Sequence, residues 1–137
     1  MMNNSLELEI EVEVPKATCV LIWRQDGKIL GVSRPDDLEA FTLPGGGMHE
    51  GEEPAEAAAR ELKEETGVEL SEIIPVFHAL ERDTPCTAFE GTPIPLDEFQ
   101  PREGEKGIVR WCTPTELANG PFGKYNQLLF SKMGISY

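Results

Sequence analysis

The stretch from Gly45 to Val68 constrains the fold most, because a run of three glycines precedes a segment rich in helix formers. Pro54 suits the first turn of a helix, where its missing N–H costs nothing. The alanines, glutamates and leucine that follow favour helix, and Gly67 suits the position just past a helix end. The sequence therefore predicts a helix from Pro54 to about Thr66. The residues expected to face a core are Ala55, Ala58 and Leu62.

Three glutamates of this predicted helix, Glu61, Glu64 and Glu65, share one face, because residues three and four apart are neighbours on a helix. Like charges at these spacings repel by roughly 0.2–0.5 kcal/mol per pair. One interpretation is a site for a hard divalent cation such as Mg²⁺, which takes oxygen ligands and is usually shared with substrate phosphates. The other is a solvated acidic face. The spacing alone leaves both open.

Alternation and turn signals predict strands around this helix. Residues 6–14 alternate apolar residues with glutamates, and Asp26-Gly27 predicts a hairpin between strands at 17–24 and 29–34. The segment 35–40 is expected to be a loop that leads to a short strand. Later strands are expected at these ranges: 72–81, 86–91 and 107–113.

Two helices are expected to close the chain. Thr113 is a suitable N-cap for a short helix. A longer helix is expected over Lys124–Met133. Its expected core-facing residues are Leu128, Leu129 and Met133. A single domain of the α+β class, arranged as an α/β/α sandwich, accommodates these elements over residues 1–137.

Composition narrows the class of protein. The net charge is −13, from 25 acidic and 12 basic residues, which argues against a protein that binds a nucleic-acid backbone through Lys and Arg clusters. No apolar run approaches the ~20 residues of a membrane-spanning helix, and the N-terminus lacks the features of a signal peptide. Three widely spaced cysteines match neither a disulfide framework nor a zinc pattern. We expect a cytoplasmic protein with reduced thiols.

The spacing of the fixed positions is specific. Gly46, Glu52, Arg60-Glu61-Leu62, Glu64-Glu65 and Gly67-Val68 fill every defined position of the pattern G-x5-E-x7-R-E-U-x-E-E-x-G-U, where U is aliphatic. This stretch resembles the Nudix box, and weaker likeness extends over residues 17–117. The resemblance implies an α/β/α sandwich with a mixed sheet. It also implies a hydrolase of diphosphates linked to a nucleoside or another moiety.

The resemblance also implies roles for individual residues. Glu64 and Glu65 match the metal-binding pair, and Glu61 matches the glutamate that binds metal or helps to activate water. Arg60 matches the arginine that orients the glutamates through a salt bridge, with Glu52 as its expected partner. Gly46 matches the glycine whose carbonyl completes the metal shell, and the implied ion is Mg²⁺ or Mn²⁺. His49 stands where many family members have a glutamate.

Outside the box, the resemblance points to a further carboxylate in the loop before Trp111. Glu103 and Glu105 are the candidates, and Glu105 is favoured as a base or metal ligand, although both suit a solvated loop equally well. Arg34 stands where family members often have a basic residue near the substrate, although an ordinary surface arginine is an equal alternative. Aromatic residues that could stack on a base, or simply fill the core, are Phe41, Phe89, Trp111, Phe122 and Tyr125.

These features predict a Mg²⁺-dependent nucleotide pyrophosphohydrolase that converts a dNTP to a dNMP and pyrophosphate. The alternative is a non-catalytic Nudix-fold module that binds nucleotides, which an intact box makes less suitable. The expected partner is a small nucleotide, with neither nucleic acid nor membrane. We also expect a homodimer built partly on the strand at 6–14, although its row of glutamates opposes such pairing.

Overall fold

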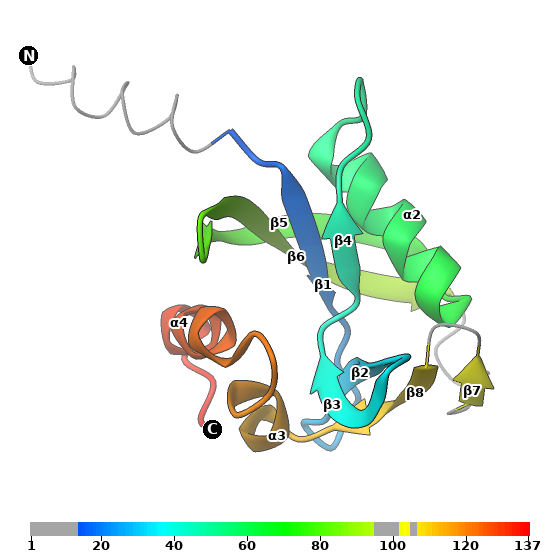
Figure 1. The fold of residues 1–137 in the computed structure, drawn as a ribbon, viewed down its shortest axis with the longest axis vertical. Coiled ribbons are helices and arrows are strands. Elements are labelled where there is room, and N and C mark those ends of the chain that lie inside the picture. The colour runs from blue at the N-terminus through cyan, green and yellow to red at the C-terminus, as the bar shows by residue number, and fades with distance from the viewer. Residues whose placement is uncertain (1–13, 95–101, 105–106) are drawn as a thin grey trace, which may run out of the picture.

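The computed structural model describes residues 14–94, 102–104 and 107–137, and its first sheet contains the glycine run. This sheet has the strand order β4-β1-β6-β5 (Figure 1). Its strands are β1 (Ala17–Leu21), β4 (Gly45–Gly47), β5 (Glu69–Glu81) and β6 (Thr84–Ile94). Because β1 runs parallel to β6 while the other pairs are antiparallel, the sheet is mixed, as the sequence predicted.

A second, antiparallel sheet has the order β3-β2-β8-β7. Its strands are β2 (Ile29–Arg34), β3 (Asp37–Thr42), β7 (Arg102–Gly104) and β8 (Gly107–Cys112). The predicted hairpin is present at its tip, where the Arg24 N–H donates to the Lys28 carbonyl at 2.8 Å. Its two arms then separate: β1 continues in the first sheet and β2 pairs with β3 and β8.

Local capping signals explain the helices. Helix α2 (Pro54–Thr66) begins with a capping box between Glu53 and Glu56, and Gly67 ends it with the left-handed φ of 79°. Helix α3 (Pro114–Ala118) is capped by the Thr113 side chain, which accepts from the Glu116 N–H at 3.1 Å. Helix α4 (Gly123–Met133) follows. All three predicted helices are confirmed.

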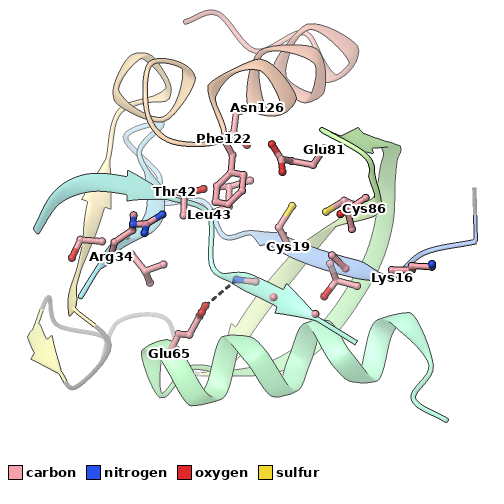
Figure 2. A pocket seen from close by; sticks show the side chains of 18 of the residues that line it. Lys16, Cys19, Arg34, Thr42, Leu43, Glu65, Glu81, Cys86, Phe122 and Asn126 are labelled. Carbon is pink, nitrogen blue, oxygen red and sulfur yellow. Dashed lines mark hydrogen bonds between the residues drawn. The ribbon is translucent and has the colours of Figure 1, made fainter. Parts of the chain in front are cut away.

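The first sheet separates two apolar cores, one under α2 and one under α4. Successive side chains of a strand point to opposite faces, so Val20 and Ile22 pack with Leu62 of α2. Cys19 and Leu21 belong to the core of α4. Figure 2 shows α2 and α4 on opposite sides of this sheet. The α/β/α arrangement is therefore confirmed.

Strand β5 continues through Pro75, which has no N–H to donate to a neighbouring strand. Because β5 lies at the edge of the sheet, a residue without an N–H is tolerated there. The pairing register with β6 shifts between Pro75 and Phe77, which absorbs the irregularity. Among the described residues, none of the helices has the length and apolar character needed to cross a membrane.

Two expectations were wrong. The segment 35–40 is not all loop, because β3 begins at Asp37. Leu128 is 56% exposed and does not face the core. The buried face of α4 instead contains Tyr125, Asn126, Leu129 and Phe130. Tyr125 and Phe130 fill the space above the sheet, and this packing decides which face of α4 is buried. The strand expected at 6–14, and the dimer built on it, lie outside the described residues.

Leu62→Ala should lower the free energy of unfolding by about 2–5 kcal/mol, because the Leu62 side chain is fully buried between α2 and the sheet. Urea unfolding followed by circular dichroism measures this change. Leu128→Ala is the matched control, and its effect should stay within about 0.5 kcal/mol. Equal losses for the two variants would contradict the assignment of the α2 core.

Candidate functional site

The three glycines of β4 meet three different surroundings. A Cβ at Gly45 would overlap the backbone of Thr18 on the neighbouring strand, so this glycine permits close strand pairing. A Cβ at Gly46 would overlap the carboxylate of Glu61, so the missing side chain lets α2 approach β4. A Cβ at Gly47 would meet nothing within 4 Å. The glycine run therefore brings the backbone of β4 against the acidic face of α2.

Arg60 joins the acidic residues of this region. Its Nε donates to Glu52 Oε2 at 2.6 Å and its Nη2 to Glu52 Oε1 at 3.1 Å, a bidentate pair. Nη2 also donates to the Gly47 carbonyl at 3.1 Å. Nη1 lies 3.3 Å from Glu61 Oε1 and 3.4 Å from Glu64 Oε1. The expected salt bridge to Glu52 is present, and one guanidinium offsets the repulsion among three carboxylates.

These contacts keep the Glu52 carboxylate ionised. Hydrogen bonds from Arg60, and then from the His49 N–H at 2.7 Å, lower the pKa of Glu52 to about 2. The same pairing raises the pKa of Arg60, mainly through its hydrogen bonds to Glu52. His49 thus contributes its backbone to the turn before α2. Glu52 is negatively charged at neutral pH and remains paired with Arg60.

The box glutamates differ in their burial and in their contacts at the edge of the first sheet. Glu65 Oε1 accepts from the Gly45 N–H at 2.9 Å (Figure 2). Glu61 is largely buried beside Gly46, and Glu64 is 44% exposed. Within the described residues, no three Asp, Glu, His or Cys side chains form a cluster closed around one point. Nevertheless, the donor set of carboxylates and a nearby backbone carbonyl suits a hard divalent cation.

A pocket of about 710 Å³ opens beside the box, on the face of the sheet that carries α4. Gly45, Gly46, Gly47 and Glu65 line one end of it. Much of the rest is lined by residues from β1, β2, β5, β6 and α4 and by Phe122 just before α4; among them are Thr18, Cys19, Arg34, Glu81, Cys86 and Asn126. The pocket is therefore a chamber that begins at the box residues and has a partly apolar wall.

The structure brings some predicted residues to this pocket and not others. Arg34 lies at the pocket, exposed and paired with Asp36 at 3.0 Å. Phe122 is the only one of the five candidate aromatic residues that lines it. Phe41, Phe89 and Tyr125 are buried in the cores. Glu105 and the side chain of Glu103 lie outside what the structure describes, so their expected roles stay predictions.

The sequence did not indicate the far wall of the pocket. Glu81, Cys86 and Asn126 lie 13, 18 and 58 residues beyond Val68, where the box ends, and belong to no motif. Asn126 is 1% exposed, and its Nδ2 donates to the Leu117 carbonyl at 3.1 Å. The one sequence signal for this wall is Asn126 itself, a polar amide on the apolar face of a helix. That signal could have indicated that α4 does more than fill the core.

Comparison with known proteins places this geometry in a family. The model of the NUDIX domain matches residues 13–130. A MutT-like protein of Streptomyces ambofaciens is 32% identical over 100 residues, which cover 72% of this chain and 63% of that protein. An RNA pyrophosphohydrolase of Roseobacter denitrificans is 39% identical over 66 residues, 44% of this chain and 41% of that one.

Other relatives match a shorter stretch or the fold alone. Nudix hydrolase 26, chloroplastic, of Arabidopsis thaliana is 47% identical over 55 residues, 40% of this chain. The chain spans less than two thirds of these curated relatives, down to 26% of the Arabidopsis protein. A solved Nudix hydrolase family member from Chromobacterium violaceum superposes with a TM-score of 0.62 at 19% identity, over 88% of this chain and 77% of that one. With the family model covering most of its length, the chain belongs to the Nudix family.

Proposed function

We propose that this chain is a Mg²⁺-dependent pyrophosphohydrolase that splits the phosphoanhydride bond of a small nucleotide, converting a dNTP to a dNMP and pyrophosphate. The observation that carries the proposal is the continuity of box and pocket. Gly45, Gly46, Gly47 and Glu65 belong to the box region and also line a pocket of about 710 Å³. A polyphosphate at the box would therefore leave its nucleoside within reach of the chamber.

The residues of the box would divide the chemical work. Glu61, Glu64, Glu65 and the Gly46 carbonyl are the groups that would hold a divalent cation, which when bound supplies charge neutralisation and lowers the pKa of water. Arg60 would hold Glu61 and Glu64 in place through its Nη1. Glu52 would orient Arg60 from the other side. Phosphoryl transfer depends mainly on positioning and charge stabilisation, which this arrangement suits.

The chamber supports a small nucleotide as the substrate. Phe122 offers an aromatic face to a base, and Arg34 at the pocket could contact phosphate if it exchanged Asp36 for the ligand. The relative from Roseobacter denitrificans is named for RNA, so 5′-triphosphate RNA is the competing substrate. A net charge of −13 weakens contact with a long phosphate backbone. We therefore favour the free nucleotide and, with three free thiols, a reducing cytoplasm.

A panel of dNTPs, NTPs, nucleotide sugars and a 5′-triphosphate RNA oligomer, incubated with Mg²⁺ in ¹⁸O-water, tests the proposal. We expect a nucleoside monophosphate and pyrophosphate from a dNTP, faster turnover of free nucleotides than of RNA, and no reaction after chelation. Phosphate released one unit at a time would indicate a phosphatase. Binding of nucleotides without any hydrolysis would favour the non-catalytic module.

Gly46→Ala should lower turnover about 10- to 100-fold, the range typical when a group that positions a metal ligand is disturbed. The new methyl group would displace the Glu61 carboxylate. Gly47→Ala is the matched control, since its Cβ would meet nothing within 4 Å. Steady-state hydrolysis and circular dichroism of both variants measure the effect. Similar turnover in the two would contradict the role assigned to Glu61.

Glu64→Gln should lower turnover by about 10²–10³-fold, as is typical when one charge-stabilising group of an active site is removed. The helical circular dichroism signal should persist, because Glu64 is 44% exposed. Glu69→Gln makes the same change of charge just past α2, at a carboxylate 3.6 Å from Lys63, and should leave turnover unchanged. Full activity of Glu64→Gln would remove this residue from the proposed site.

A further inference from the structure

Two cysteines that the proposed reaction does not use lie together in the pocket wall. Cys19 is on β1 and Cys86 is on the adjacent parallel strand β6, with Ala17 opposite Cys86 and Ala88 opposite Cys19. Opposed residues and residues two apart point to the same face of a sheet. Both thiols therefore lie on the α4 face, and their opposed neighbours are small alanines.

The two thiols face the same space and each other. Figure 2 shows both sulfur atoms at the edge of the pocket, near Glu81. The two thiols shift each other's pKa: Cys86 raises the pKa of Cys19, and Cys19 lowers the pKa of Cys86. The Tyr125 hydroxyl donates to the Cys86 carbonyl at 2.8 Å, which fixes this part of β6 under α4. The two cysteines are thus fixed in place by the pairing of β1 with β6 and by the contact of β6 with α4.

The strand geometry favours a bridging atom over a direct bond. Adjacent strands lie ~4.8 Å apart and a two-residue offset adds ~6.6 Å along them, so the Cα atoms are roughly 8 Å apart. Disulfides rarely form when this separation exceeds ~7 Å. A thiophilic atom with bonds of about 2.3 Å to each sulfur spans a longer gap than the ~2.05 Å bond of a disulfide.

We propose that Cys19 and Cys86 form a dithiol site that takes one thiophilic centre of the trivalent arsenical class, and that its occupation closes the pocket to substrate. The reaction is R–As=O + 2 R′–SH → R–As(S–R′)₂ + H₂O. Two As–S bonds form, and the arsenical oxygen leaves as water with both thiol protons, so nothing is oxidised or reduced. The closure of the pocket rests on the proposed function; the dithiol site itself does not.

Cys112 supplies the internal control. It is fully buried, its Sγ lies 3.8 Å from the Arg110 carbonyl oxygen, and it does not line the pocket. Burial raises the pKa of Cys112 to about 11, and the pKa of Cys19 is raised as well, so contact with the pocket rather than pKa distinguishes Cys112 from the pair. Since the chain has three cysteines, a two-thiol adduct has three possible pairs. The structure selects the pair of Cys19 and Cys86.

Phenylarsine oxide and intact-protein mass spectrometry test the site. Attachment to two thiols adds the reagent mass minus one water, whereas attachment to one thiol adds the full reagent mass. We expect one water-loss adduct in the wild type and in Cys112→Ala, and none in Cys19→Ala or Cys86→Ala. Excess of a small dithiol should reverse it. A full-mass adduct in the wild type, or a water-loss adduct that survives Cys86→Ala, would overturn the proposal.

Two further measurements do not depend on how the variants fold. Proteolysis of the wild-type adduct should yield the peptides of Cys19 and Cys86 joined through arsenic, and a link to Cys112 would overturn the site. The adduct should also lose at least 10-fold in nucleotide hydrolysis and regain it with the dithiol; unchanged hydrolysis would overturn the closure. If the unmodified protein hydrolyses nothing, the proposed function fails, while the mass measurements still decide the dithiol site.

Discussion

The pairing of Arg60 with Glu52 is the interaction on which the rest of the candidate site depends. Like-charged glutamates on one helix face repel each other, and Arg60 offsets this by donating to Glu52, Glu61 and Glu64 from one planar group. Its bond to the Gly47 carbonyl also ties α2 to the sheet. A lysine could not reproduce this, because a single ammonium lacks the planar fork that holds Glu52 by two parallel bonds.

The glycines of β4 complete this arrangement by removing side chains where three elements meet. Gly45 approaches the backbone of Thr18, and Gly46 leaves room for Glu61. Helix α2 covers one face of the sheet, and the pocket opens on the other. The glutamates can serve the pocket because β4 is at the sheet edge, where Glu65 reaches the Gly45 N–H. An interior position for β4 would have closed that route.

Local signals made the helix and the box predictable, and non-local pairing explains what was missed. The bounds of α2 follow from Pro54 and Gly67, which act within one turn of the chain. The division into two sheets depends on which distant strands pair, as when β1 pairs with β6, whose matched residues are 69 positions apart in the sequence. The prediction that Leu128 faces the core was wrong for a similar reason, since the neighbours of α4 decide which of its faces is buried.

The charge of the chain bears on the proposed substrate as well. A net charge of −13 repels a free polyphosphate at long range, and this repulsion acts over about 10 Å at 0.1 M salt. A nucleotide that arrives with its divalent cation carries less negative charge and meets less repulsion. At the box, carboxylates repel phosphate but attract the cation. The acidity that disfavours a nucleic-acid backbone is thus compatible with a metal-complexed nucleotide, for which the glutamates of α2 and the cation are mutually attractive.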